Sequence, residues 1–337
     1  ITVILLFACN ALQVWHLYIV NAIGGLMNTV QQPASEIAST ALVPEKHYQK
    51  IGGLRYFSSS LSSILTPVIA TAVYSFSGLE AVLTVDLLTF AVAFITLMFF
   101  IRIPKQSAES AKLSLIKSAK SGLDFLKSHK QVLMLIMYLS AINLVASMYE
   151  AVLPAMVLSR KGGGTEALGA VNTCVGVATL IGSIIATLMP KPKSRRRVIC
   201  LSLLFSMSTE NFFLAFGQTP LLWCTGAVLG WIVIPMMSAN LDVIMRTKVP
   251  CDMQGRVYSA RNTLQFFTIP LGNFLGGLAV DTFAEPLMAA MPHNSLMCNI
   301  FGSGKGSGAA LIFFIIGIMG VAVCLIFNSN KHIKKIE

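Results

Sequence analysis

Long apolar runs, separated by short groups of charged residues or of Gly, Pro and Ser, repeat along the whole chain. A membrane-spanning helix needs about 20 mainly apolar residues. Nine runs are long enough, and a shorter run covers residues 1–13. The nine expected spans are residues 15–37, 51–75, 80–101, 131–159, 166–189, 197–217, 220–246, 257–280 and 308–328. This pattern predicts an all-α membrane protein.

The run at the start of the chain is too short for a complete span, and it lacks the flanks of a signal peptide. We therefore expect the chain to begin partway through a membrane helix. Two of the later connections are long: residues 104–130, and the loop at residues 281–307.

The composition supports a membrane protein. Of the 337 residues, 55% are hydrophobic and only 12% are charged, whereas soluble domains carry about 25% charged residues. This excludes an ordinary soluble enzyme, a disordered chain and a nucleic-acid-binding protein. The seven cysteines are scattered without C-x-x-C spacing, so we expect no metal site, no disulfide framework and no cofactor.

The net charge of +11 is distributed unevenly between the loops. When alternate loops are assigned to alternate sides, 22 of the 25 Lys and Arg residues fall on one side, and only Arg160, Lys161 and Lys305 fall on the other. Because short cytoplasmic loops retain Lys and Arg, the basic side is predicted to be cytoplasmic. The C-terminus lies on that side.

The chain is expected to have four parts: a partial N-terminal helix bundle (1–103), a cytoplasmic linker (104–130), a C-terminal six-helix bundle (131–330) and a basic cytoplasmic tail (331–337). The linker is either a helix on the anionic inner leaflet or a solvated connection. Its apolar residues recur at helical spacing among lysines: Leu113, Ile116, Leu123 and Leu126.

The chain also contains an internal repeat. Many secondary transporters are built from two similar halves, with the binding site near the bilayer midplane between them. Six spans follow the linker, but only three and a partial one precede it. A shift of 206 residues aligns Gly24 with Gly230, Glu36 with Asp242, Val43-Pro44 with Val249-Pro250, Lys50-Ile51 with Arg256-Val257, and Arg55 with Arg261.

Three further segments carry a family resemblance: Leu42-Val43-Pro44-Glu45, Val85-Asp86-Leu87-Leu88-Thr89-Phe90 and Gln254-Gly255-Arg256-Val257. Together with the repeat, they resemble the major facilitator superfamily, and specifically its macrolide-efflux-like drug:proton antiporter branch. The resemblance covers essentially the whole chain and starts within the third family helix. It implies a two-bundle fold in which about ten of the twelve membrane helices are present, the first two and the start of the third being absent.

Antiporters of this superfamily often carry a Gly-rich motif in the fifth helix, with the pattern G-x8-G-x3-G-P-x2-G-G. In this chain only the first Gly and the Pro match. The other positions hold small residues, which also permit close helix packing. The six positions are Gly53, Ser62, Thr66, Pro67, Ala70 and Thr71.

Acidic residues within spans are costly and mark candidate functional sites. Glu150 lies about nine residues from the outer end of its span, roughly 14 Å along a helix, and continues a polar stripe with Ser140, Asn143 and Ser147. It is our first candidate for proton coupling, and a hydrogen-bonded structural role is the alternative. Glu210 is the second candidate, because the resemblance implies that its helix is peripheral.

The repeat also places two similar stripes on equivalent helices. The resemblance implies that these helices and the Glu150 helix line a central cavity, although ordinary helix packing explains the Trp and Met residues equally well. The expected cavity residues are Thr29, Gln32, Asn143, Ser147, Trp231, Met237 and Ser238.

An inner gate is implied at the cytoplasmic ends of the spans. Its expected members are charged residues of both halves, with Asp242 facing the basic turn: Glu36, Arg55, Asp242, Arg261, Arg195, Arg196 and Arg197. Helix-end carboxylates that simply reach water are the alternative for the two acids.

The resemblance implies a multi-pass secondary transporter, not an enzyme, in a bacterial cell membrane. It would export amphipathic drug-like compounds, with macrolides as one candidate, by alternating access coupled to proton influx. The expected partners are the bilayer, a small lipophilic substrate and protons, without nucleic acid, and the protein would be monomeric. The alternatives are a carrier for a nutrient or lipid, a membrane-embedded lipid transferase and a non-transporting fragment.

Overall fold

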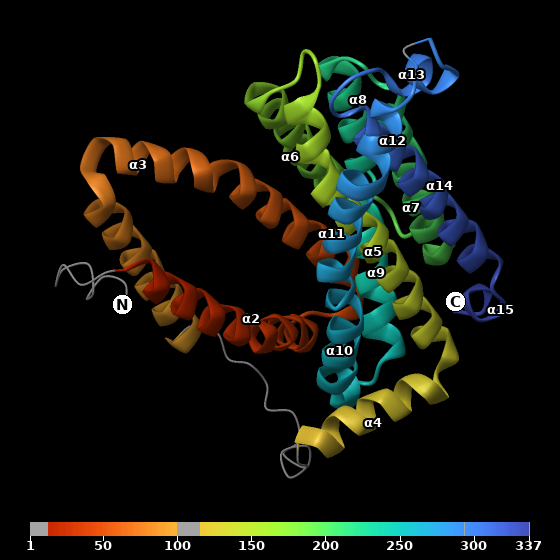
Figure 1. The fold of residues 1–337 in the computed structure, drawn as a ribbon. Coiled ribbons are helices and arrows are strands. Elements are labelled where there is room, and N and C mark those ends of the chain that lie inside the picture. The colour runs from red at the N-terminus through yellow and green to blue at the C-terminus, as the bar shows by residue number, and fades with distance from the viewer. Residues whose placement is uncertain (1–12, 100–114, 293, 337) are drawn as a thin grey trace. The chain divides into compact units, whose positions relative to one another are not determined.

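The computed structural model describes residues 13–99, 115–292 and 294–336 (Figure 1). The expected partial span at residues 1–13 and the first part of the linker therefore lie almost wholly outside the described residues. The chain divides into two compact units, which are described separately. The first comprises Ile1–Glu45 with Ser62–Leu113, and the second comprises Lys46–Leu61 with Ser114–Glu337.

Within the described residues, seven segments are long and apolar enough to span a membrane. Six of them end within two residues of the predicted limits, so the predicted all-α membrane fold is confirmed. The segments are Glu80–Phe99, Lys130–Ser159, Thr165–Leu188, Arg195–Phe216, Pro220–Lys248, Cys251–Ala289 and Ser307–Ser329.

The first unit holds helix α2 (Val14–Leu42) and most of α3 (Tyr48–Phe99), with the short helix η1 (Glu45–His47) between them in sequence. Helix α3 covers two predicted spans and is interrupted at Gly78, where φ is 71° and ψ is −172°. Glycine adopts a positive φ without steric cost, so the chain changes direction there.

The sequence repeat is also a repeat of local structure. Helix α2 ends before Val43, which is extended (φ −127°, ψ 135°), and α9 (Ile234–Lys248) ends before Val249, which is also extended (φ −104°, ψ 118°). Both valines precede a proline, and a proline disfavours the helical conformation of the residue before it. The two helix ends are 206 residues apart, as the sequence alignment requires.

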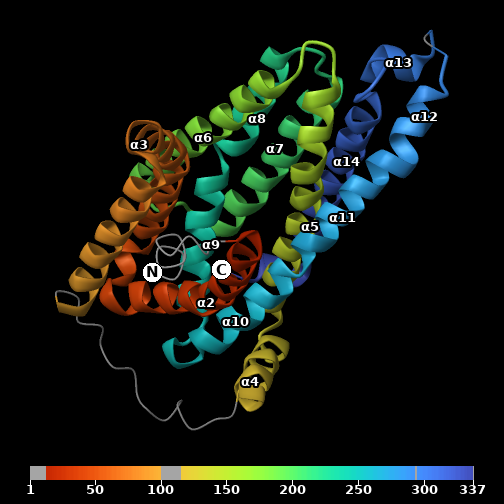
Figure 2. The same ribbon diagram turned by 60° about the vertical axis from the view of Figure 1, so that its left-hand side comes forward.

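The second unit contains the C-terminal helices (Figure 2). Four of its long elements are single helices, and two are interrupted. The remaining elements of this unit are α4 (Leu115–Ser128), α5 (Lys130–Ser159), α6 (Thr165–Leu188), α7 (Arg195–Phe216), α8 (Pro220–Trp231), α10 (Cys251–Phe266), α11 (Thr268–Leu278), the π-helix η3 (Ala279–Ala284), α12 (Glu285–Ala289), α13 (Leu296–Phe301), α14 (Ser307–Ser329) and α15 (Lys331–Lys334).

Two prolines account for two of the interruptions. A proline lacks the backbone N–H, and its ring clashes with the carbonyl group four residues earlier. Helix α8 ends at Trp231, four residues before Pro235, and α10 ends at Phe266, four residues before Pro270. Trp231 is thereby placed next to a break in the middle of its membrane segment.

The prediction of a long loop from residue 281 was wrong, because the helix continues through η3 and α12 to Ala289. A high content of Gly, Pro and Met suggested the loop, but polar side chains of this stretch are hydrogen-bonded within a helix or to α14. The Thr282 hydroxyl donates to the Leu278 carbonyl oxygen at 2.6 Å. Glu285 Oε1 accepts from the backbone N–H groups of Gly306 (2.9 Å) and Ala309 (3.2 Å), at the start of α14.

Arg160, directly after α5, connects three parts of the same end of the bundle. Its guanidinium donates to the carbonyl oxygens of Gly217, between α7 and α8, and of Phe301, at the end of α13. Burial lowers the pKa of Arg160, and the nearby Glu285 carboxylate opposes this shift.

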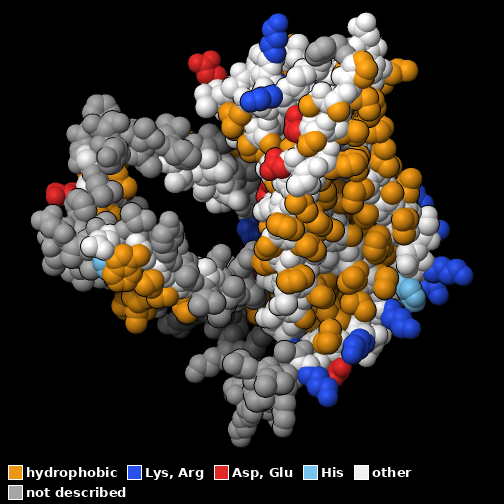
Figure 3. Space-filling model, in the orientation of Figure 1, with side chains coloured by type: hydrophobic (Ala, Val, Ile, Leu, Met, Phe, Trp, Pro, Cys, Tyr) orange, Lys and Arg blue, Asp and Glu red, His pale blue; other side chains and the backbone are white. Residues whose placement is uncertain are grey.

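Hydrophobic side chains cover the middle of the face of the second unit shown in Figure 3, whereas Lys and Arg side chains lie near its ends. Inside, the helices pack around large buried side chains such as Trp223, Tyr138 and Phe313. This distribution suits a bundle whose middle is surrounded by lipid.

Candidate functional site

A cavity of about 210 Å³ lies inside the second unit. Helices α5, α7, α8, α9 and α14 contribute to its wall, which is mainly apolar. Ligand sites typically combine such a wall with a few polar groups. The polar and aromatic lining residues are Asn143, Tyr149, Glu150, Ser206, Glu210, Asn211 and Trp231.

Glu210 on α7 is the buried acid of this cavity, with only 4% of its surface exposed. The Trp231 indole Nε1–H donates to Glu210 Oε1 at 2.6 Å. The Tyr149 side chain lies beside the same carboxyl group, and its buried hydroxyl has no hydrogen-bond partner in the described part of the chain. Two aromatic side chains thus surround one carboxyl group.

Gly230 makes room for this carboxyl group. A Cβ atom at position 230 would lie 2.6 Å from Glu210 Cβ and 2.7 Å from Glu210 Oε2. Real Cβ atoms do not approach other atoms so closely. The glycine therefore allows α8 to pack against α7 at the level of Glu210.

Glu150, the first candidate from the sequence, lines the same cavity but is exposed. The two acidic candidates thus belong to one cavity in different surroundings. Asn143, Trp231 and Met237, predicted as cavity residues, also line it.

Other predicted cavity residues lie elsewhere. The Ser147 hydroxyl donates to the Asn143 carbonyl oxygen at 2.7 Å, and the buried Ser238 hydroxyl lies 3.9 Å from the Met237 sulfur. The side chains of Thr29 and Gln32, also predicted as cavity residues, are not among those that the structure describes. Sequence reasoning missed Tyr149, because an aromatic residue in an apolar run carries no signal of a polar contact.

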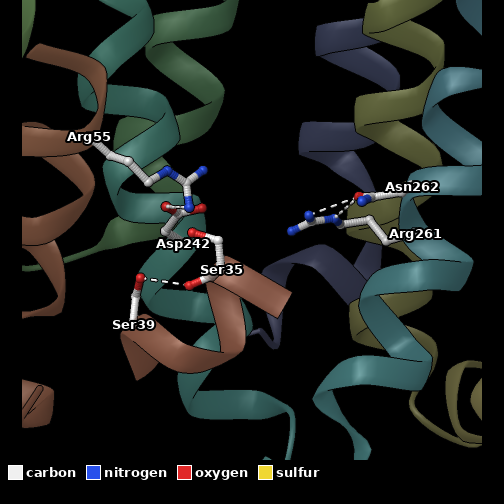
Figure 4. Close-up of polar contacts among 6 residues, drawn as sticks. All are labelled: Ser35, Ser39, Arg55, Asp242, Arg261 and Asn262. Atoms are coloured by element: carbon white, nitrogen blue, oxygen red, sulfur yellow. Dashed lines mark hydrogen bonds and ion pairs between the residues drawn. The ribbon is translucent and has the colours of Figure 1, made fainter. Parts of the chain in front are cut away.

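Arg55 and Asp242 form an ion pair, with Arg55 Nη1 at 3.6 Å from Asp242 Oδ2 (Figure 4). Both residues were predicted gate members. The pair joins the first part of α3, within the second unit, to α9. Asp242 is largely buried, whereas the Arg55 side chain is 38% exposed.

Arg195 forms a second link at the same level. Its Nη1 donates to Gln49 Oε1 at 3.1 Å and to Asn240 Oδ1 at 2.8 Å, while Gln49 Nε2 donates to the Met189 carbonyl oxygen at 2.9 Å. The start of α3 is therefore hydrogen-bonded to the turn before α7 and to Arg195, which in turn bonds α9. Gln49 was not predicted.

Three further predicted gate residues, Arg261, Arg196 and Arg197, make contacts of their own. Arg261 donates to Asn262 Oδ1 from Nε (3.0 Å) and Nη2 (2.9 Å), as Figure 4 shows, and its guanidinium lies 4.9 Å from the Tyr258 ring centroid. Arg196 donates to Asn328 Oδ1 at 3.0 Å, on α14. Arg197 is exposed, and its backbone N–H donates to Ser194 Oγ, the N-cap of α7. Glu36 lies in the first unit.

The first position of the antiporter-like motif has a clear packing role. A Cβ atom at Gly53 would overlap the Thr187 side chain and lie 2.9 Å from the Thr187 backbone nitrogen. Ser62 and Thr66 are exposed, and the side chains of Pro67, Ala70 and Thr71 lie outside the description. The close approach therefore occurs between α3 and α6.

Comparison with known proteins identifies the family. The sequence profile of the Major Facilitator Superfamily matches residues 1–273. "Macrolide efflux protein A" of Streptococcus pyogenes is 24% identical over 275 residues, covering 80% of this chain and 67% of the relative. The protein of the same name from Enterococcus faecalis is 24% identical over 266 residues, covering 77% of this chain and 81% of the relative.

The "Uncharacterized MFS-type transporter YfiS" of Bacillus subtilis is 23% identical over 287 residues, covering 80% of this chain and 66% of the relative. Proteins of this family are multi-pass membrane transporters and not enzymes. The family match covers far more than half of the chain, and the helical segments agree with it. The chain belongs to the Major Facilitator Superfamily.

Proposed function

We propose that this transporter exports bulky amphipathic compounds from a bacterial cell in exchange for protons, with lipophilic bases such as macrolides as the first class to test. The names of two similar relatives support macrolide efflux. The mainly apolar cavity with two carboxyl groups supports a lipophilic, positively charged substrate.

The observation that carries this proposal is the buried Glu210 carboxyl group between Trp231 and Tyr149. A charged carboxylate in apolar surroundings is costly unless an opposite charge or a hydrogen bond offsets the cost. A proton or a substrate cation can both supply the positive charge. Two ligands that neutralise one carboxylate compete for it, and this competition is the basis of exchange.

Glu210 is therefore our proposed proton site, and Glu150 is the second choice. Glu150 lines the same cavity but is exposed and, among the described residues, has no comparable aromatic enclosure, so we rank it second. Because Glu150 lines the same cavity, it can attract a cationic substrate toward Glu210. This order reverses the one that the sequence suggested.

The hydrogen-bonded cluster of Gln49, Arg195 and Asn240, with the ion pair between Arg55 and Asp242, would close the cytoplasmic side. We place the C-terminus on that side, because most basic loops fall there. Opening toward the cytoplasm would then require these links to separate.

Inside-out membrane vesicles containing the full-length protein provide the test. Export then appears as uptake of radiolabelled erythromycin, and an acidic vesicle lumen should drive it. We expect uptake to rise with the pH gradient and to stop when a protonophore is added. Erythromycin uptake that does not depend on the pH gradient would contradict proton exchange. Gradient-driven uptake of sugars or lipids, without uptake of erythromycin, would indicate a different kind of carrier.

A further inference from the structure

Helices α6 and α8 lie side by side in both ribbon views (Figures 1 and 2). The two run in the same direction, since each follows a turn at the end of the bundle where Arg160 lies. They come close at Gly182, where a Cβ atom would overlap the carbonyl oxygen of Ile232, directly after α8. These two positions are 50 residues apart in sequence.

The same offset of 50 residues relates Cys174 on α6 to Cys224 on α8, about two helical turns nearer the starts of both helices. The two thiols interact with each other through their side chains. Both cysteines are partly buried against the hydrophobic core, and both are reduced. Register and contact thus place two thiols together between parallel helices.

We propose that Cys174 and Cys224 form a peroxide-sensitive thiol pair that oxidises to a disulfide between α6 and α8. One thiol gives up its proton and attacks hydrogen peroxide, so that an S–O bond forms and the O–O bond breaks, and the leaving hydroxide takes up the proton and departs as water. The second thiol likewise gives up its proton and attacks this sulfur, so that the S–S bond forms and the S–O bond breaks, and the second hydroxide takes up that proton and departs as water. Two thiols are oxidised, and one peroxide is reduced to two water molecules.

The other described cysteines do not combine a nearby second thiol with partial exposure of both side chains. Cys200, Cys298 and Cys324 are buried. Cys251 is exposed at the start of α10, and its sulfur lies 4.0 Å from the Gln254 side chain rather than beside a thiol. Partial exposure of both partners is what lets a small oxidant reach the proposed pair.

The disulfide would tie α8 to α6 above the break at Pro235. Trp231, which holds the Glu210 carboxyl group, lies at the end of this α8 segment. Oxidation would therefore restrict the helix that carries Trp231, although the cross-link itself does not depend on what the protein transports.

The experiment treats the purified full-length protein in nanodiscs with hydrogen peroxide, blocks remaining thiols with N-ethylmaleimide and analyses the digest by mass spectrometry. We expect one cross-linked peptide pair containing Cys174 and Cys224, two hydrogen atoms lighter than the separate reduced peptides. Dithiothreitol should remove it. Phenylarsine oxide should also bridge the two thiols with loss of one water molecule, which tests their proximity without mutation.

Cys174→Ser and Cys224→Ser should each abolish the cross-link, and the matched control Cys251→Ser should leave it intact. The proposal is overturned if both thiols remain alkylatable after peroxide treatment. It is equally overturned if either one accumulates as sulfinic acid without the cross-link, or if Cys224 cross-links as well in Cys174→Ser protein.

Discussion

At the scale of residues, the two intramembrane acids show what a sequence can and cannot specify. The helical spacing of Glu150 and its polar neighbours is visible in the sequence, and the structure places Glu150 and Asn143 at one cavity. The surroundings of Glu210 are not visible, because Trp231 reaches it from another helix. Glu210 ranked below Glu150 in the sequence-based prediction only because the resemblance implies that the Glu210 helix is peripheral.

Replacing Glu210 by Gln removes the charge and keeps the size of the side chain and an acceptor for the Trp231 N–H. We expect proton-driven uptake of the macrolide to fall to the level of vesicles without transporter. Downhill exchange of substrate should persist with a weaker substrate affinity, because the cavity is preserved but the carboxylate that would bind the substrate cation is gone. Under the same assay, Glu150→Gln should only weaken substrate affinity; equal losses in both variants would argue against the proposed order.

Asp242→Asn removes one partner of the ion pair with Arg55. A partly exposed pair contributes about 1 kcal/mol or less, so we expect the cytoplasmic side to open at most about fivefold more often. The measurement is the rate at which a cytoplasmic maleimide labels a cysteine introduced as Asn143→Cys. Glu166→Gln, at the exposed start of α6, is the control that should not change this rate.

At the scale of elements, helix ends follow from local sequence, whereas close packing depends on partners far away. The breaks four residues before Pro235 and Pro270 follow directly from the missing N–H and the ring clash. The π-helix η3 and the continuation to Ala289 escaped prediction, because Glu285 is stabilised by the start of α14, some 20 residues later.

Two glycines determine how closely α11 packs against α5. A Cβ atom at Gly272 would lie 2.8 Å from Ser147 Cβ, and one at Gly276 would lie 2.9 Å from the Met148 carbonyl oxygen, whereas Gly277 has nothing within 4 Å. We expect Gly272→Ala or Gly276→Ala to cost about 1–3 kcal/mol of stability through overpacking. Gly277→Ala is the matched control and should be neutral or slightly stabilising, because alanine favours helix.

The midpoint of thermal unfolding in detergent measures this difference. If Gly277→Ala lowers the midpoint as much as the other two substitutions, helix packing at these glycines is not the cause. Which of these three glycines touch α5 is not visible in the sequence and required the structure.

Arg160→Ala should loosen the end of the bundle formed by α13 and the start of α14. The Phe301 carbonyl group would lose its donor, and an unsatisfied buried group costs about 1–3 kcal/mol. The Gly217 carbonyl group would keep the hydrogen bond from the Trp223 indole N–H. Hydrogen–deuterium exchange of residues 294–306 should become faster, while exchange in the middle of α7 should not change. Unaltered exchange in the loop would show that Arg160 does not hold it.

At the scale of the whole molecule, composition and the spacing of apolar runs specify the membrane class, and the repeat specifies the family organisation. The 206-residue repeat also predicts equivalent helix ends, because α2 ends before Val43 and α9 ends before Val249. Contacts such as Arg195 with Gln49 were beyond prediction, because they join residues 146 positions apart. The sequence thus predicts the family and its organisation, but it does not predict the long-range contacts that form the candidate site.

The central claim is that one buried carboxyl group, Glu210, is shared in turn by a proton and by the substrate. The most direct measurement is the number of protons that purified full-length protein releases into weakly buffered solution when saturating erythromycin is added. We predict release by the wild type and by Glu150→Gln, and none by Glu210→Gln. Substrate binding without proton release in the wild type, or undiminished release by Glu210→Gln, would contradict the claim.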